Sequence, residues 1–125
     1  MFHVKIKLKE SPIHRIGLFT DQTIFKGEKI YTANPKLDLV LSQEEFTKLP
    51  EDERKTIKHY GYLDKNDKKW HLSFEDIRFC NNNIKGNLTL KGNSTVAKRD
   101  IKKGEELTQN YEEIEELENN KKRLN

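Results

Sequence analysis

The apolar residues of this chain occur in short runs that alternate with polar residues. The first ten residues are MFHVKIKLKE, in which every second position is apolar: Phe2, Val4, Ile6 and Leu8. An alternation of period two is typical of a strand with one buried face. No apolar run approaches the ~20 residues that a bilayer-spanning helix needs. The pattern favours a small β-rich domain that begins with a half-buried strand over residues 2–8.

Short strands with glycine-containing turns continue along the chain. We expect them in five further segments: 16–19, 23–31, 70–74, 88–98 and 101–107. The segment 88–98 is predicted to be a hairpin, because two apolar runs flank the turn dipeptide Gly92-Asn93. Residues 24–28 and 101–105 share the sequence Ile-x-Lys-Gly-Glu. Two similar turns are therefore expected, with glycine supplying a positive φ in each.

Residues 42–60 have helical signals instead. Ser42 followed by Glu45 forms a capping box, which marks a helix start. Pro50 suits the first turn of a second short helix, and Gly61 is a plausible helix stop. The sequence therefore predicts a helical insert at about 42–60 inside a β-rich chain.

The C-terminal segment has a different composition from the rest of the chain. After Tyr111 it is rich in Glu and ends in Lys-Lys-Arg, an order that complements a helix dipole and predicts a helix over 112–123. A length of 125 residues corresponds to one domain. We expect a single domain over 1–125, with its core over about 2–111.

Charge and cysteine content exclude several classes of protein. The 24 Lys and Arg residues are interleaved with 21 Asp and Glu residues, and a net charge of +3 is not the footprint of a nucleic-acid-binding protein. A single cysteine, Cys80, excludes an internal disulfide and a four-cysteine zinc site. The N-terminus lacks the apolar region of a signal peptide. We expect a cytoplasmic monomer or homodimer that contacts neither membrane nor nucleic acid directly.

No standard catalytic signature is present. The four histidines, His3, His14, His59 and His71, match no metal-binding spacing, so no metal site is expected. Cys80 is predicted to be a small buried residue rather than a nucleophile. The run Asn81-Asn82-Asn83 has two interpretations. It is either a turn, since Asn tolerates left-handed backbone, or a polar pocket for the amine or carboxylate of a ligand.

Three segments, in this order, resemble the SET domain of protein-lysine methyltransferases. They are 15–28 (RIGLF followed by I-x-KGE), 78–87 (RFCNNNIKGN) and 97–111 (AKRDIKKGEELTQNY). The corresponding family patterns are Gly-x-Gly-hydrophobic-Phe with Ile-x-x-Gly-Glu, Arg-Phe-x-Asn-His-Ser-x-x-Pro-Asn, and Ala-x-Arg-x-Ile-x-x-Gly-Glu-Glu-Leu-Thr-x-Asp-Tyr. The insert at 42–60 falls where the variable SET insert belongs. The chain looks like a minimal SET protein without flanking zinc modules.

The resemblance implies a fold of small, mostly antiparallel sheets around a C-terminal pseudoknot. In that knot a C-terminal segment threads under a loop, which brings Asn81 and Tyr111 together. The implied activity is methyl transfer from S-adenosylmethionine to the amine of a lysine in a protein or peptide substrate. The alternative is a degenerate SET module that binds a basic peptide or partner without catalysis. It rests on the departures Arg15 for Gly, Asn82 for His and Asn83 for Ser.

The resemblance also implies site residues. Tyr111 would be the catalytic tyrosine, and Tyr62 and Tyr111 would contact the substrate. The residues implied to bind the cofactor are Arg15, Ile16, Gly17, Tyr60, Arg78, Phe79, Asn81 and Asn82. In such a site the protein mainly positions and desolvates the reactants, because the cofactor carries the activated methyl group.

Overall fold

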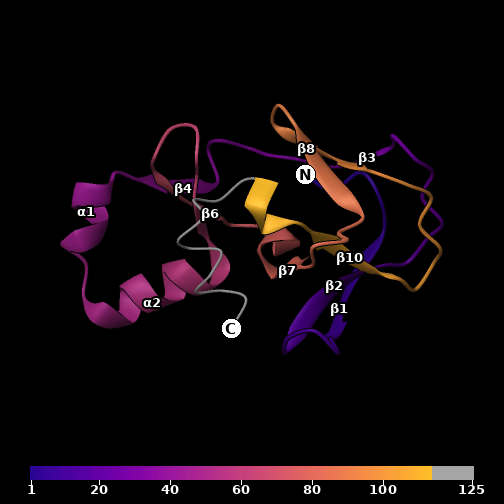
Figure 1. Ribbon diagram of the computed structural model, residues 1–125, viewed down its shortest axis with the longest axis horizontal. Coiled ribbons are helices and arrows are strands. Elements are labelled where there is room, and N and C mark those ends of the chain that lie inside the picture. The colour runs from indigo at the N-terminus through magenta and orange to yellow at the C-terminus, as the bar shows by residue number, and fades with distance from the viewer. Residues whose placement is uncertain (114–125) are drawn as a thin grey trace.

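A sheet of seven strands forms the larger part of the computed structural model, which describes residues 1–113 (Figure 1). Its strand order is β1-β2-β10-β8-β9-β3, and β7 pairs with β10 beside this path. The strands are β1 (Ile6–Glu10), β2 (Ile16–Thr20), β3 (Lys29–Thr32), β7 (Asn81–Asn82), β8 (Leu88–Lys91), β9 (Ser94–Ala97) and β10 (Glu106–Gln109). The prediction of a mostly β fold with short helices is confirmed.

The first strand differs from its prediction in position and burial. It spans Ile6–Glu10 rather than 2–8, and four of its five residues are exposed. β1 lies at the edge of the sheet and pairs only with β2, so most of its side chains have no neighbouring strand to cover them. Phe2 instead forms an isolated bridge with Tyr31. Val4 is the buried residue of this N-terminal segment, and Phe2 and Ile6 pack against the same core while partly exposed.

The two Ile-x-Lys-Gly-Glu segments pair with each other. Ile24 and Ile101 exchange backbone hydrogen bonds of 2.8 Å in both directions. Gly27 has φ +88° and Gly104 has φ +94°, so both glycines adopt the predicted left-handed turn conformation. The strands predicted over 23–31 and 101–107 are therefore shorter than expected, and each is reduced to this bridge, a glycine turn and one strand.

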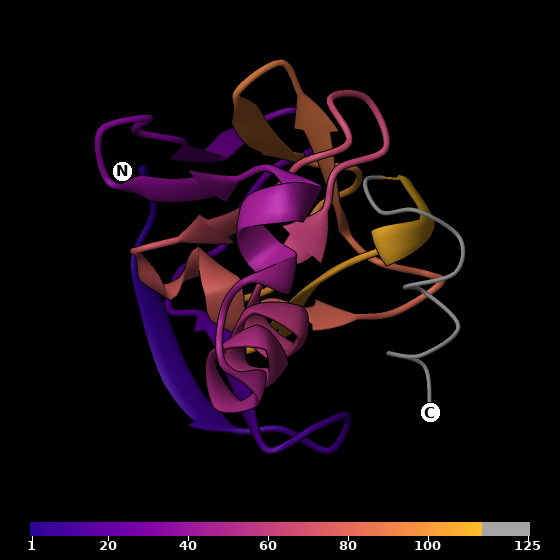
Figure 2. The same cartoon turned by 90° about the vertical axis from the view of Figure 1, so that its left-hand side faces the viewer.

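A second, smaller unit is formed by the part of the sequence between β3 and β7. It contains β4 (Asp38–Leu41), α1 (Gln43–Thr47), α2 (Glu51–Tyr60), β5 (Tyr62–Leu63) and β6 (Trp70–Ser73). The strands pair antiparallel in the order β4-β6-β5. Figure 1 shows this unit at one end of the molecule, and α1 and α2 face the viewer in Figure 2. We call residues 38–73 the insert.

The predicted helical signals of the insert are largely confirmed. Both hydrogen bonds of the capping box between Ser42 and Glu45 are present. Pro50 is the N-cap of α2 rather than a residue of its first turn. Gly61 ends α2, but with φ −109° rather than a left-handed conformation. A Cβ atom at Gly61 would lie 2.4 Å from the carbonyl oxygen of His71, so close approach of β6 explains the glycine.

Parallel pairing between β7 and β10 joins two segments that are far apart in the sequence. Asn81 pairs with Thr108 and Asn82 with Gln109. The Asn87 side chain also binds β10, because it donates to the Glu106 carbonyl and accepts from the Thr108 amide, both at 2.9 Å. We call the place where β7 and β10 pair the β7–β10 crossing. This is the meeting of segments that the family resemblance implies, and it places the end of β10 beside Asn81.

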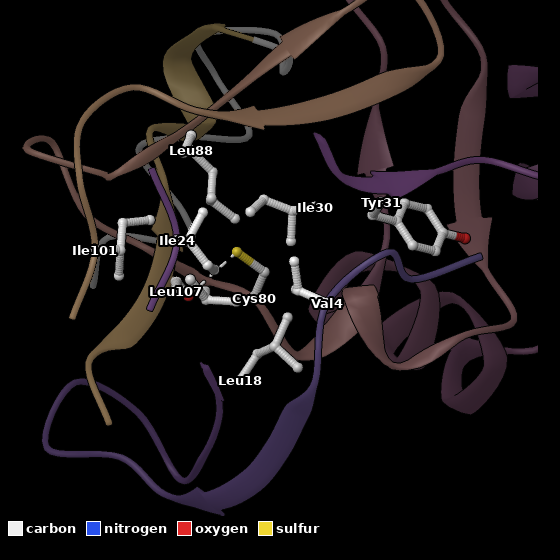
Figure 3. Close-up of a cluster of buried hydrophobic side chains, with 10 residues drawn as sticks. Val4, Leu18, Ile24, Ile30, Tyr31, Cys80, Leu88, Ile101 and Leu107 are labelled. Carbon is white, nitrogen blue, oxygen red and sulfur yellow. Dashed lines mark hydrogen bonds between the residues drawn. The ribbon is translucent and has the colours of Figure 1, made fainter. Parts of the chain in front are cut away.

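The main sheet packs around an aliphatic core (Figure 3). Its residues with no exposed surface include Leu18, Ile24, Ile30, Leu88, Ile101 and Leu107. Cys80 is buried among them and donates a hydrogen bond from Sγ to the Leu107 carbonyl, as predicted for a small buried residue.

Two short 3-10 turns complete the described elements. η1 (Asp76–Phe79) precedes β7, and η2 (Tyr111–Glu113) follows β10. The helix predicted over 112–123 lies outside the described residues, apart from the η2 turn. No helix within residues 1–113 is long and apolar enough to cross a bilayer.

Candidate active site

A cleft of about 810 Å³ opens between the β1–β2 loop, α2 and the start of β7. Seven of the eight residues predicted to bind a cofactor line it: Arg15, Ile16, Tyr60, Arg78, Phe79, Asn81 and Asn82. Tyr111 lines it as well. The structure thus brings together residues from four separate parts of the chain, and their individual roles stay predictions.

Gly17 is the predicted cofactor residue that lies elsewhere. It is buried behind the cleft, and a Cβ atom there would lie 2.3 Å from Glu106 Oε2 and 2.9 Å from Ser11 Cβ. Because Gly17 has no side chain, the Glu106 carboxylate can pack directly against the backbone of β2. The structure thus gives the glycine a packing role, and its predicted contact with a cofactor stays a prediction.

Glu106 organises the loop that forms one wall of the cleft. The Ser11 hydroxyl donates to both carboxylate oxygens at 2.8 Å, and Asn81 Nδ2 donates to Oε2 at 2.8 Å. The same amide nitrogen also lies 3.2 Å from the His14 carbonyl and 3.4 Å from the Ile16 carbonyl. Asn81 thereby fixes the loop at residues 14–16. Glu106 was not predicted as a site residue, although it stands inside the family motif.

Arg15 occupies the position where the family pattern has glycine. Its φ is +36°, one of two positive values at non-glycine residues in the described part of the chain. Its carbonyl accepts a 2.7 Å hydrogen bond from the Ser11 amide, which closes the β1–β2 turn. The turn thus keeps a conformation that suits glycine while adding an exposed guanidinium at the cleft.

The cleft is rich in basic side chains that sequence reasoning missed. Besides Arg15 and Arg78, it is lined by Lys55, Lys58, His14 and His59. Positions 55, 58 and 59 have the i, i+3 and i+4 spacing of one helix face, which is the signal that could have identified them. His14 and His59 bring Nε2 atoms within 3.3 Å of each other and so connect the β1–β2 loop to α2.

A second cavity, of about 480 Å³, is lined by all four tyrosines of the chain. These are Tyr31, Tyr60, Tyr62 and Tyr111. Three carboxylate residues also line it: Asp38, Asp64 and Glu113. Burial raises the pKa of the Tyr31 hydroxyl to about 12, so this phenol is neutral at physiological pH. We call this cavity the tyrosine cavity and the first one the basic cleft.

Three residues line both cavities: Tyr60, Arg78 and Tyr111. Tyr111 is 9% exposed and is held at both ends. Its hydroxyl donates to the Cys80 carbonyl, and its amide donates to Asn82 Oδ1 at 2.8 Å. Burial raises the pKa of the Cys80 thiol to about 12, so Cys80 is not a thiolate nucleophile. Tyr60 and Tyr111 are the two residues with a hydroxyl group that line both cavities, and Tyr111 is the buried one.

One group of possible metal ligands occurs among residues 1–113. Atoms of Asp64, Asp67 and His71 lie within 4.8 Å of one another at the β5–β6 turn. Asp64 Oδ1 accepts backbone hydrogen bonds from Asn66 and Asp67, and His71 pairs with Asp67 at 2.7 Å. These contacts close the turn, and the prediction that the protein needs no metal stays a prediction.

Comparison with known families matches residues 15–112 to the SET domain. No curated protein sequence matches the chain significantly. Solved structures do match. A chain of the active polycomb repressive complex 2 in the basal state has a TM-score of 0.64 and 24% identity over 86% of this chain. A chain of ctPRC2, autoinhibited and bound to S-adenosylmethionine, has a TM-score of 0.67 and 21% identity over 92%.

A third match differs in how much of the other chain is covered. A candidate histone methyltransferase of Plasmodium falciparum has a TM-score of 0.62 and 21% identity over 88% of this chain and 95% of its own. In contrast, the present chain spans only 15% and 16% of the two polycomb chains. At these identities the three structures establish a shared fold.

Proposed function

The chain belongs to the SET-domain family, and we propose that it is an S-adenosylmethionine-dependent protein-lysine methyltransferase. The observation that carries the proposal is the meeting of two cavities of opposite character at Tyr111. One is lined by basic side chains and the other by tyrosines and carboxylates. A transfer enzyme needs two binding spaces that meet, because the reacting atoms of its two substrates must come within about 3–3.5 Å of each other.

The basic cleft has the size and donor set for the cofactor. Ligand sites for small molecules usually have volumes of about 300–1,000 Å³, and the cleft has about 810 Å³. The guanidinium groups of Arg15 and Arg78 suit a carboxylate. Asn81 Oδ1, which has no hydrogen-bond partner within residues 1–113, can accept from an ammonium group. When bound, S-adenosylmethionine supplies a methyl group on a sulfonium, so the protein needs no covalent nucleophile.

The tyrosine cavity suits a lysine side chain. Aromatic faces attract an ammonium group through cation–π interactions and also pack against its methylene stem. The hydroxyl proton of Tyr111 is committed to the Cys80 carbonyl. Its oxygen can therefore act on an incoming amine only as a hydrogen-bond acceptor. We assign Tyr111 the role of orienting the amine rather than of removing its proton.

Arg78 and burial favour the neutral amine that the reaction requires, and they act against the carboxylates of the same cavity. Arg78 lines the shared wall with Tyr111. A nearby positive charge lowers the pKa of a lysine, and so does burial in a tyrosine-lined cavity. The proton then leaves to solvent before transfer.

A non-catalytic binding module is the second candidate. It is favoured by one observation, which is that the Asn81 amide nitrogen and the Tyr111 hydroxyl are both bonded within the chain. Such a protein would use the tyrosine cavity to hold a basic peptide or partner without turnover. Cofactor binding separates the two candidates.

The test is calorimetric titration with S-adenosylmethionine, followed by transfer of a labelled methyl group to lysine-containing peptides. We expect micromolar binding. The variant Tyr111→Phe should keep cofactor affinity within about threefold and lose roughly 10²-fold in kcat, as for loss of one positioned hydrogen-bonding group. Unchanged kcat in Tyr111→Phe would reject the assigned role, and absence of cofactor binding at millimolar concentration would favour the binding module.

A further inference from the structure

Two polar atoms of the tyrosine cavity lack partners. Within residues 1–113, Asp38 Oδ1 and Gln109 Nε2 are buried side-chain atoms without a hydrogen bond. Both residues line the tyrosine cavity, and Gln109 is 6% exposed. Leaving a buried polar group unsatisfied costs about 1–3 kcal/mol. An unpartnered donor and an unpartnered acceptor in one cavity give a ligand two groups with which it can pair.

The three carboxylates of this cavity are not equivalent. Glu113 forms an ion pair with Lys98 and accepts from the Thr89 hydroxyl at 2.9 Å. Asp64 accepts backbone amides of its own turn. Asp38 has no ion pair in the described part of the chain. Asp64 has none either, but of these two residues only Asp38 has a buried oxygen without a hydrogen-bond partner, so Asp38 is the carboxylate left to pair with a ligand.

The positions of the two residues suggest how a peptide would lie. Asp38 is in β4 of the insert and pairs in register with Ser73 of β6. Gln109 ends β10, two residues before Tyr111. A peptide in this cavity can therefore contact Gln109 of the main sheet, which is a hydrogen-bond donor, and Asp38 of the insert, which is an acceptor. It offers the two complementary groups, a main-chain carbonyl and a cationic side chain.

We propose that the substrate carries a second cationic side chain close to its target lysine, and that Asp38 selects it while Gln109 holds the peptide backbone. Asp38 Oδ1 and Gln109 Nε2 have almost no exposed surface in the structure, so both side chains turn toward the bound peptide. The Asp38 carboxylate then accepts from an arginine or lysine that flanks the target, and the Gln109 amide donates to a peptide carbonyl. This proposal rests on the proposed function and deepens it. Charge complementarity supports it, because a partly buried carboxylate discriminates between a cationic and a neutral side chain.

The experiment uses the full chain and a matched set of synthetic peptides with one central lysine. Each peptide carries either arginine or citrulline, its neutral isostere, at a single position within three residues of the lysine. Wild-type protein should show a ratio of kcat/KM for arginine over citrulline of about tenfold or more at one position. Asp38→Asn should reduce that ratio to below about twofold and leave S-adenosylmethionine affinity unchanged.

Two further variants distinguish recognition of the flanking arginine by Asp38 from nonspecific effects of a substitution. Gln109→Met removes the donor and should raise KM for both peptides while keeping the arginine preference. Asp52→Asn makes the same charge change as Asp38→Asn at an exposed residue of α2 that lines neither cavity, and it should change nothing. Loss of the arginine preference in Asp52→Asn would reduce the effect to net charge and overturn the proposal.

The possible results distinguish this proposal from the proposed function. Transfer with equal kcat/KM for arginine and citrulline at every position overturns the selectivity of Asp38 and leaves the methyltransferase intact. If neither cofactor binding nor transfer is found, the proposed function fails. The same peptide pairs are then compared by calorimetric binding. An arginine preference that disappears in Asp38→Asn still supports the subsite, and its absence overturns it.

Discussion

The main sheet and the insert have hydrophobic cores of very different size. The main core contains ten buried residues, most of them aliphatic and several with no exposed surface. The insert core contains three, Phe46, Ile57 and Trp70, with the rings of Phe46 and Trp70 stacked at 4.3 Å. Its helices span five and ten residues, lengths that are not stable alone in water. The insert therefore depends on a few contacts, whereas the main sheet has many.

The two regions also contribute different chemistry to the site. The chain outside the insert supplies Asn81, Gln109 and Tyr111, which are fixed by strand pairing or by hydrogen bonds at the β7–β10 crossing. The insert supplies Tyr60 and Asp38. The main sheet would thus hold the groups that take part in transfer, and the less stable insert would hold those that select the substrate. Substrate preference could then change without loss of the transfer geometry.

The largest expected effect comes from truncation in the main core. Leu107 has no exposed surface, and Leu107→Ala should cost about 3–4 kcal/mol of the free energy of unfolding. That is a large fraction of the 5–15 kcal/mol typical of a domain. Ile57→Ala in the insert core should cost about 2 kcal/mol. Urea unfolding gives both values.

Hydrogen exchange tests whether the regions respond separately. In Ile57→Ala we expect faster exchange confined to α2 and its neighbours β5 and β6, with β2 and β10 unaffected. Equal acceleration throughout the main sheet would show a single cooperative unit and remove the distinction between the two regions.

A pair of glycines gives an intermediate effect in each region. A Cβ atom at Gly86 would lie 2.8 Å from the backbone nitrogen of Asn110, and one at Gly61 would lie 2.4 Å from the His71 carbonyl. Both contacts are with backbone, so alanine at either position should cost about 1–3 kcal/mol. Gly86→Ala should weaken cofactor binding, because the β7–β10 crossing moves. Gly61→Ala should mainly raise KM for peptide.

Calorimetry and transfer kinetics on the two alanine variants check this. Gly27→Asn is the control, since Gly27 has φ +88°, has no atom within 4 Å of a Cβ atom and lines neither cavity. Asn tolerates left-handed backbone, so this variant should lose less than about 1 kcal/mol. If Gly61→Ala weakened cofactor binding as much as Gly86→Ala, the assignment of cofactor binding to the main sheet and of peptide binding to the insert would be wrong.

Features encoded by neighbouring residues could be predicted from the sequence. The capping box at Ser42 and the turns at Gly27 and Gly104 depend on local backbone chemistry, and all three are confirmed. The proximity of Asn81 and Tyr111 was predicted in a different way. It came from the family resemblance, because no local pattern reveals a parallel pair of strands two residues long.

Features set by distant contacts could not be predicted. β4 was missed because Leu39 and Val40 are both exposed and the segment has no alternation. The packing of the Glu106 carboxylate against Gly17 joins residues about 90 positions apart, and no local pattern reports it. The unpartnered atoms of Asp38 and Gln109 are defined by what surrounds them in three dimensions, which no spacing in the sequence reports.

A smaller effect is expected at the two non-glycine residues with positive φ, one in each region. Arg15, in the β1–β2 turn, has φ +36°, and Lys68, in the β5–β6 turn, has φ +60°. Glycine relieves about 1 kcal/mol of strain at such positions but adds about 0.4–1 kcal/mol of unfolded-chain entropy. Both glycine variants should therefore be neutral or more stable by less than about 1 kcal/mol.

The two variants should differ in ligand binding. Arg15→Gly removes a guanidinium from the basic cleft and should weaken S-adenosylmethionine binding several-fold, whereas Lys68→Gly, which lines neither cavity, should not. Thermal unfolding and calorimetric titration measure the two properties independently. Equal cofactor affinity in both variants would exclude Arg15 from the cofactor site.

The smallest effect is a pH dependence that arises in the insert. Burial raises the pKa of the Asp38 carboxyl above its usual 3.8, partly offset by the Ser73 hydroxyl. A group whose pKa is higher in the folded state resists ionisation there. It begins to destabilise the fold as the pH rises past its unfolded-state pKa, and the effect is complete above its folded-state pKa. Below pH 3.8 the carboxyl is largely protonated in both states, and the destabilisation is absent.

Asp38→Asn should therefore raise Tm at pH 7 and leave it unchanged near pH 3. A half-exposed position usually changes stability by less than about 0.5 kcal/mol, which corresponds to a Tm shift of about 1–2 °C. Glu45 supplies the opposite sign within the same insert, because hydrogen bonds from Ser42 lower the pKa of its carboxyl. Glu45→Ala should lower Tm at pH 7, with a loss that shrinks as the pH falls. A lower Tm for Asp38→Asn at pH 7 would mean that the carboxylate stabilises the fold. Asp38 would then need no ligand to account for its place in the tyrosine cavity.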